Sequence, residues 1–310
     1  MGLVIALLAT LGYVIGAAYW GGTTGGLGLL GVFGVVAIVW SLIGYYSGDK
    51  MVLAVSGAHQ VTHDDEPQLY NVVEEMTIAA GLPQPPRVFV IEEDAPNAFA
   101  TGRDPQHASI AVTRGLMRRL NREELQGVIA HELSHVRNYD IRFATLVGIL
   151  VGMIALVADF FLRSTIFGGF GRRRGGDSGG NIIMFGLAIM LAILAPLAAY
   201  TVQFAIARRR EFLADASAVE LTRNPLGLAR ALNKIAVDNQ PLLHANRATA
   251  HLYIANPLKK KKDKERSSAF DTHPPIGRRI ALLLAMAHVG PEALSAGPEG
   301  SPPQPQTTTT

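Results

Sequence analysis

Four long apolar blocks divide the chain, at residues 3–20, 27–46, 143–162 and 182–207. Each block is long enough to cross a hydrocarbon core of about 30 Å as a helix. A soluble protein would need a large polar body to bury four such helices, and the rest of the 310 residues does not supply one. The pattern therefore predicts a mainly α membrane protein with four transmembrane helices.

Charges beside these blocks predict their orientation. The loop 21–26 carries no charge, whereas Lys50 follows the second block and arginines occupy positions 208–210 after the fourth. Because positive residues favour the cytosolic side, we expect this loop outside and both termini in the cytosol. The arginines between residues 163 and 174 oppose this topology if the third and fourth blocks cross completely, so the full crossing of that hairpin stays open.

The polar segment 47–142 has the pattern of a small α+β domain. Apolar residues at helical spacing predict a helix over 68–80. Two β-branched runs, 87–91 and 109–113, predict strands of a sheet of two or three. Asn121, followed by acidic residues, predicts a capped helix that reaches about residue 137.

The second polar segment, 208–290, is predicted to be helical at its start. One helical pattern stops near Asn224, and a second begins at Pro225 and reaches about residue 237. The end of the chain should be a disordered tail. The organisation that follows has five parts: a membrane hairpin 1–46, a cytosolic part 47–142, a second hydrophobic hairpin 143–207, a second cytosolic part 208–290 and the tail 291–310.

The amino-acid composition excludes several classes of protein and of functional site. A hydrophobic share of 49% and a charged share of 17% exclude disorder over most of the length. The chain has no cysteine, which excludes a disulfide scaffold, a thiol nucleophile and a thiolate metal site. The basic run 259–262 has no interleaved aromatic residues, so it indicates a solvated loop and not a nucleic-acid site.

The segment His131-Glu-Leu-Ser-His135 carries the strongest chemical signal. On a helix, histidines four residues apart lie on one face and can share one metal ion. Glu132 then flanks the open side of that ion. This arrangement predicts metal-assisted hydrolysis, in which Glu132 takes a proton from the attacking water.

A tetrahedral Zn²⁺ with two histidines and one water lacks one protein ligand. Without cysteine, that ligand must be Asp, Glu or another His. Glu211 is the best placed, because the third and fourth blocks return the chain to the side it left; His273 is the next candidate. Asp215 lies one helical turn after Glu211 and can accept a hydrogen bond from the outer nitrogen of a ligating histidine.

With the four blocks in register, four motifs resemble the HtpX-type membrane zinc metallopeptidases, which include the CAAX prenyl endopeptidases. The motifs are Asn97-Ala-Phe-Ala-Thr-Gly102, His131-Glu-Leu-Ser-His135 with Asp140, Arg210-Glu-Phe-Leu-Ala-Asp215, and Thr272-His-Pro-Pro275 with Arg279. The resemblance implies a zincin-like (gluzincin) catalytic domain with one Zn²⁺ per chain. Its ligands would be His131, His135 and Glu211, and Glu132 would be the catalytic carboxylate.

The same resemblance implies further roles. Asn97, Ala98, Phe99 and Ala100 would lie on the edge strand that pairs with an extended substrate. His273 and Arg279 would help to stabilise the transition state. Asp140 is expected to be a structural carboxylate beside the site and not a ligand.

The expected function is a zinc-dependent endopeptidase of the cell inner membrane that cleaves misfolded or unfolded membrane proteins, and soluble ones, at the cytosolic face as part of a stress response. Its expected partners are these substrates, the lipid bilayer, and further copies of itself or other membrane quality-control proteases, with no nucleic acid.

CAAX-type processing is the narrower alternative. A non-hydrolytic metal transporter would need polar residues inside the spans, which hold almost none apart from Asp159. A catalytically silent adaptor would usually have lost one of the four site residues.

Overall fold

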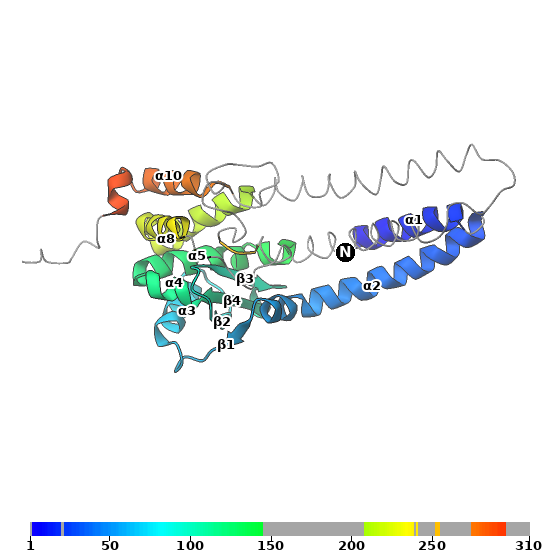
Figure 1. Ribbon diagram of the computed structural model, residues 1–310, viewed down its shortest axis with the longest axis horizontal. Helices are drawn as coiled ribbons and strands as arrows, with labels where there is room; N and C mark the ends of the chain where they lie inside the picture. The colour runs from blue at the N-terminus through cyan, green and yellow to red at the C-terminus, as the bar shows by residue number, and fades with distance from the viewer. Residues whose placement is uncertain are drawn as a thin grey trace, which may run out of the picture.

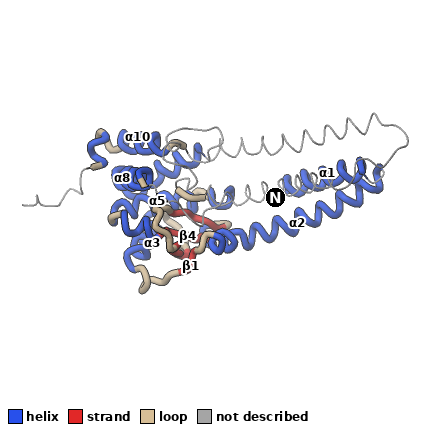
Figure 2. The backbone as a smooth tube through the Cα atoms, viewed as in Figure 1, coloured by secondary structure: helices blue, strands red, loops and turns tan. Residues whose placement is uncertain are grey.

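The computed structural model describes residues 2–19, 22–144, 208–238, 240, 252–254 and 274–295. It is mainly helical and holds a mixed four-stranded sheet (Figures 1 and 2). Almost all of the third predicted span, all of the fourth, and the tail after residue 295 lie outside the described residues. The same holds for His273.

Two apolar helices form a hairpin that projects from the body (Figure 1). They are α1 (Gly2–Tyr19) and α2 (Gly22–Val55). Glycines allow the two backbones to approach closely: a Cβ on Gly16 would lie 2.2 Å from the carbonyl oxygen of Gly25. Small residues serve the same purpose where helices pack within membranes.

Among the described residues, α2 is the one helix that has the length and apolar character to cross a membrane. Large apolar side chains are exposed along it from Leu27 to Tyr46, the block predicted as the second span. The helix does not end at Tyr46, however, and continues to Val55. At about 1.5 Å per residue, its 34 residues are longer than the hydrocarbon core requires, so its last turns reach the body.

The end of α2 is fixed to the sheet. Asp49 forms an ion pair with Arg87 at 2.8 Å, and the guanidinium of Arg103 lies 5.4 Å from the ring centroid of Tyr46. Leu53 is buried in an apolar cluster under the sheet. The predicted boundary at residue 47 therefore falls inside a continuous helix.

The sheet has the strand order β1-β2-β4-β3. Its strands are β1 (Ala58–Gln60), β2 (Arg87–Ile91), β3 (Ala98–Gly102) and β4 (Ala108–Thr113). The central pair β2 and β4 is parallel, and both outer strands run antiparallel to their neighbours. The prediction of two or three strands was wrong, because β1 is only three residues long and has no alternating apolar pattern.

Both faces of the sheet are covered. On one face, Val88 and Val90 join the main core with α3 (Pro67–Ala79), α5 (Arg122–Arg137), α8 (Pro225–Val237) and α10 (Ile276–Met286). On the other, Phe89 and Ile91 pack with Leu53 from α2. Alternate residues of a strand point to opposite faces, so a strand that is buried on both sides reads as a continuous apolar run. Short α4 (Arg114–Arg119), η1 (Pro105–His107) and η2 (Pro291–Leu294) complete the body.

Local sequence signals set the helix ends. Asn121 and Glu124 form a capping box at the start of α5, as the sequence predicted. α8 begins at Pro225, with the side chain of Asn224 accepting a hydrogen bond from the backbone N–H of Gly227. Residues 208–222 form the helix that precedes α8. The cap at Asn121 therefore sets the start of α5, the helix that carries His131, Glu132 and His135.

Candidate metal centre

Two histidines of α5 form one side of the site. The Nε2 atoms of His131 and His135 lie 3.3 Å apart. α5 is packed tightly against α8, since a Cβ on Gly127 would lie 2.7 Å from the backbone nitrogen of Leu228. The spacing of four residues places both imidazoles on one helix face, as the sequence predicted; His131 is buried, whereas the side chain of His135 is 15% exposed.

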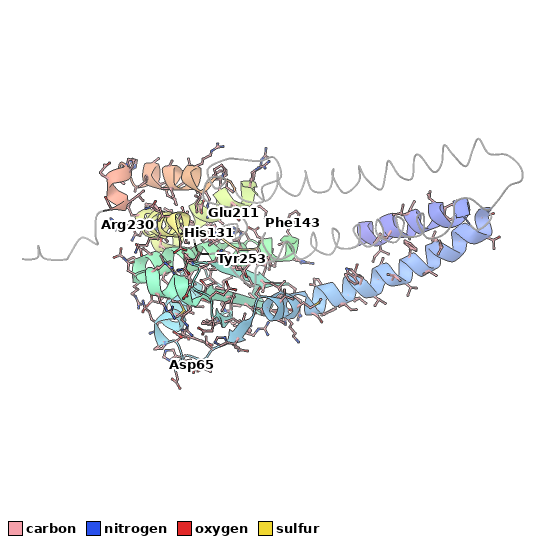
Figure 3. The ribbon with its side chains drawn as sticks, viewed as in Figure 1. Asp65, His131, Phe143, Glu211, Arg230 and Tyr253 are labelled. Carbon is pink, nitrogen blue, oxygen red and sulfur yellow. The ribbon has the colours of Figure 1, made fainter. Side chains whose placement is uncertain are left out.

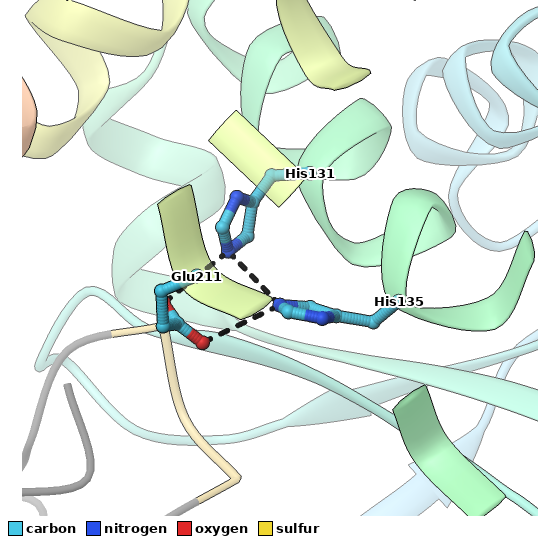
Figure 4. Close-up of side chains that lie close together, drawn as sticks. All are labelled: His131, His135 and Glu211. Carbon is cyan, nitrogen blue, oxygen red and sulfur yellow. Dashed lines mark hydrogen bonds and ion pairs between the residues drawn. The ribbon is translucent and has the colours of Figure 1, made fainter. Parts of the chain in front are cut away.

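The helix of residues 208–222 supplies a third donor. The Oε1 atom of Glu211 lies 3.5 Å from Nε2 of His135, and its Oε2 atom lies 3.8 Å from Nε2 of His131. Figure 4 shows the two imidazoles and this carboxylate turned toward one common point. The three groups form a cluster that can hold a metal ion.

The size and chemistry of this cluster fit Zn²⁺. Tetrahedral zinc with bonds of about 2.0–2.2 Å holds neighbouring ligand atoms about 3.3–3.6 Å apart. The separations of 3.3, 3.5 and 3.8 Å are close to that range. Two imidazole nitrogens and one carboxylate oxygen are also a donor set that zinc uses in catalytic sites.

A carboxylate holds each histidine from behind. The Nδ1 atom of His131 lies 3.0 Å from Oδ1 of Asp215, and Nδ1 of His135 lies 2.8 Å from Oδ2 of Asp140. When Nδ1 of an imidazole donates to a carboxylate, its Nε2 carries a lone pair that can bind metal. The structure thus places Asp215 and Asp140 where they orient the two candidate ligands.

Two arginines hold those carboxylates in turn. The side chain of Arg279 is 1% exposed and donates from Nε and Nη2 to the two oxygens of Asp215, at 2.8 and 2.7 Å. Its Nη1 atom lies 3.2 Å from Oε2 of Glu211. Arg210 donates from Nε to Asp140 at 2.6 Å. Arg279 therefore contacts two acidic groups of the site, Asp215 and Glu211, and its role in the transition state stays a prediction.

The predicted substrate strand lies beside Glu132, the predicted catalytic carboxylate. β3 is one of the two outer strands of the sheet, and the backbone N–H of Ala100 donates to the buried carboxylate of Glu132. Asn97 is buried, and its side chain accepts a hydrogen bond from the backbone nitrogen of Ala98. The side chain of Phe99 points to the opposite face of the sheet, where its ring packs on Tyr253.

Comparison with known proteins identifies the family. The model of peptidase family M48 matches residues 63–287, which contain the whole site. The chain belongs to peptidase family M48. Two proteins described as protease HtpX homologues are similar to it: one from Ligilactobacillus salivarius is 45% identical over 91% of this chain and 93% of its own length, and one from Levilactobacillus brevis is 47% identical over 92% and 93%.

The fold of this M48 peptidase has a solved counterpart. The crystal structure of S. mikatae Ste24p matches 91% of the chain with a TM-score of 0.53 and 20% sequence identity. The chain spans 62% of the length of that protein, and a likeness at this identity concerns the fold alone. Together with the family and the apolar helix α2, the HtpX relatives identify a membrane metalloprotease, as the sequence predicted.

Burial sets the proton affinities in the site of this M48 peptidase. Burial, helped by the charge of Arg279, lowers the pKa of His131 to about 4, so this imidazole is neutral at neutral pH and can bind a metal. Burial raises the pKa of Glu132 to about 7, with a smaller contribution from the charge of Glu211. A carboxylate with a pKa near the working pH is suited both to accept and to return a proton.

Besides the pairing of Arg279 with Asp215, sequence reasoning missed the contacts that two residues make at the site. Arg210 was part of a recognised motif, but nothing in that motif indicated that it would pair with Asp140. Ile254 gave no signal, yet its backbone contacts both β3 and Arg279. Both contacts join segments that are far apart in the chain, so no local spacing rule finds them.

Proposed function

We propose that this M48 peptidase is a zinc endopeptidase that cleaves misfolded and unfolded membrane proteins, and soluble ones, at the cytosolic face of the cell inner membrane. The observation that carries this proposal is the convergence of His131, His135 and Glu211, with the Glu132 carboxylate beside them and the outer edge of β3 next to it. The zincin-like character of the domain and one Zn²⁺ per chain are part of the proposal.

His131, His135 and Glu211 would hold the ion. Bound Zn²⁺ supplies Lewis acidity, which makes water a stronger acid and a peptide carbonyl a better electrophile. Glu132 accepts the proton of the attacking water and then delivers it to the leaving amine. Asp215 and Asp140 keep the two imidazoles in place during these steps, and Arg279 and Arg210 keep those carboxylates in place.

The main chain of β3 would bind the substrate. An extended peptide that adds a strand to a sheet edge is held by main-chain hydrogen bonds, which make little demand on sequence. This mode of binding supports broad specificity for unfolded chains. Within the proposal, His273 assists the transition state from outside the described residues.

The membrane arrangement is proposed from the helices and the charges. The exposed apolar side chains of α2 support a crossing over residues 27–46, and the docking of its last turns on the sheet supports a position of the body close to one membrane surface. The basic residues after the second and fourth apolar blocks support the cytosolic side, and the lengths of the four blocks support four crossings. Homo-oligomers or association with other membrane quality-control proteases belong to the same proposal.

The test is a comparison of zinc content and cleavage of an unfolded protein such as casein. Wild type and Glu132→Ala are purified in detergent, with chelator present to limit self-digestion, and reloaded with zinc. Glu123→Ala is the matched control, because Glu123 is exposed on the first turn of the same helix.

We expect one zinc per chain in all three proteins and cleavage in wild type and the control alone. Zinc binding without cleavage of any unfolded or membrane substrate would contradict the hydrolytic function and favour a metal-binding role. Cleavage by Glu132→Ala would contradict the role of that carboxylate.

A further inference from the structure

The outer edge of β3 is already in use by another part of the chain. Asn97 accepts a hydrogen bond from the backbone N–H of Thr113 at the β4 side. In an antiparallel pair the next residue directs its peptide groups to the opposite side, so Ala98 and Ala100 face the open edge. The carbonyl oxygen of Ala98 accepts a hydrogen bond from the backbone nitrogen of Ile254 at 2.9 Å.

Residues 252–254 are deeply seated at this edge. Tyr253 is fully buried, and its ring packs edge-on against Phe99, with ring centroids 5.0 Å apart. Ile254 is buried in the main core, and its carbonyl oxygen accepts a hydrogen bond from Nη1 of Arg279 at 3.0 Å. Figure 3 shows Tyr253 in the same central part of the body as His131 and Glu211. One short segment thus contacts both the substrate strand and the arginine of the metal centre.

The place of the Ile254–Ala98 hydrogen bond on β3 determines how it affects substrate binding. Ala98 lies two residues before Ala100, whose N–H is held by Glu132, so its carbonyl is an acceptor on the same open edge, one edge position away from the residue that contacts Glu132. An extended substrate that adds to β3 needs such acceptors for its own N–H groups. A carbonyl that is bonded to Ile254 is not available in the same direction to a second strand.

We infer that residues 252–254 compete with the substrate for the edge of β3. This segment must release the Ala98 carbonyl before a peptide can pair along the whole edge. This inference rests on the proposed function. The peptidase then exists in a closed form, which the structure shows, and an open form that binds substrate along the edge. The apparent KM rises as the fraction of the open form falls.

The membrane helix α2 packs in the same apolar cluster as Leu252 and Tyr253. Leu53 of α2 and Tyr253 belong to the same buried cluster, and Val52 and Leu252 pack against it. Shortening a side chain on either side of the contact should loosen the segment. A change in α2, outside the catalytic centre, is therefore expected to act in the same direction as a change in Tyr253.

The first test measures KM and kcat of full-length variants in detergent, with a fluorogenic unfolded peptide as the substrate. Only the cleavage that depends on Glu132 is counted. Tyr253→Ala and Leu53→Ala should each lower KM about 3- to 10-fold with little change in kcat, because they raise the open fraction. Tyr253→Phe keeps the ring contact and should keep the KM of wild type. Met51→Ala, on α2 but with a side chain that is 56% exposed, is the control for Leu53.

The second test needs no substitution in the enzyme. A synthetic peptide with the sequence of residues 250–256, Ala-His-Leu-Tyr-Ile-Ala-Asn, is added to wild type. We expect competitive inhibition, and at least threefold weaker inhibition when the nitrogen that corresponds to Ile254 is methylated, because methylation removes the donor to Ala98. Equal inhibition by the two peptides would overturn the inference even if the variants do not fold.

The outcomes separate this inference from the proposed function. Wild-type cleavage that disappears in Glu132→Ala, together with a lowered KM in Tyr253→Ala, supports both. The same Glu132-dependent cleavage with an unchanged or raised KM in Tyr253→Ala and Leu53→Ala overturns the competitor alone, since the segment is then a fixed wall of the site. Absence of Glu132-dependent cleavage in every variant overturns the proposed function and the inference that rests on it.

Discussion

Asp215 lies 3.0 Å from Nδ1 of His131 through one carboxylate oxygen, and both of its oxygens are held by Arg279. The three residues form a buried chain in which a fixed positive charge orients a carboxylate and the carboxylate orients an imidazole. This chain ends at the Nε2 atom that faces the candidate metal position. The contribution of this chain of contacts to metal binding and to stability can be tested separately from catalysis.

Replacing Asp215 by Asn should weaken metal binding. The amide keeps the shape of the side chain but removes the charge that holds His131, and loss of such a partner typically lowers metal affinity about 10- to 100-fold. Competition with a zinc chelator measures the change. Glu220→Gln is the matched control, because Glu220 is exposed on the same helix. Equal zinc affinity in both variants would show that Asp215 does not support the ligand.

Replacing Arg279 by Met should destabilise the fold. The substitution leaves the buried Asp215 carboxylate without its bidentate partner, and breaking a buried ion pair in this way costs about 3–5 kcal/mol. A thermal unfolding experiment on the zinc-free protein in detergent measures the loss. Arg278→Met, at the neighbouring exposed position, should unfold near the temperature of wild type. Similar unfolding of the two variants would contradict this account of Arg279.

The stability that Asp215 contributes should depend on pH. Although burial raises the pKa of Asp215, the charge of Arg279 and the hydrogen bond from His131 outweigh it and lower the pKa to about 2. Because the folded pKa lies below the unfolded value of about 3.9, this contribution is fully present above about pH 4 and is lost as the pH falls toward 2.

The free energies of unfolding of wild type and Asp215→Asn, measured across this pH range, test the direction of this pH dependence. The stability of wild type relative to the variant should shrink by about 2 kcal/mol between pH 5 and pH 2. A difference that grows as the pH falls would contradict the lowered pKa.

The hairpin of α1 and α2 can be tested by cross-linking, since the natural chain has no cysteine. A Cβ on Gly34 would lie 4.0 Å from that of Ala9, within the range that a disulfide spans. The double variant Ala9→Cys/Gly34→Cys should therefore form a disulfide on mild oxidation, detected as a band shift on a non-reducing gel.

A bulky residue at the helix crossing should prevent this bond. Gly16→Val, added to the cysteine pair, places side-chain atoms against the backbone of Gly25 and should reduce cross-linking several-fold. Gly28→Val is the control, because a Cβ on Gly28 meets no atom within 4 Å. Efficient cross-linking in the Gly16→Val background would contradict the close approach of the two helices.

Local sequence patterns alone determined several elements of the structure. The caps at Asn121 and Asn224 set where α5 and α8 begin, and spacing of four residues placed His131 and His135 on one face. Such signals depend on atoms within one or two helical turns, so they can be read directly from the chain. Glu211 was predicted as the third ligand because the absence of cysteine left few donor types and the predicted apolar hairpin would return the chain to the same side.

Only the tertiary structure decided the rest. The pairing of Arg279 with Asp215, of Arg210 with Asp140 and of Ile254 with Ala98 joins segments that no periodicity relates. The short β1 and the extension of α2 to Val55 likewise depend on contacts with the sheet and not on local preference. Side chains and peptide groups of this kind acquire partners only when packing brings distant segments together. Local pattern therefore predicted the candidate ligands His131 and His135, while packing determines which groups hold them and which segment contacts the edge of β3.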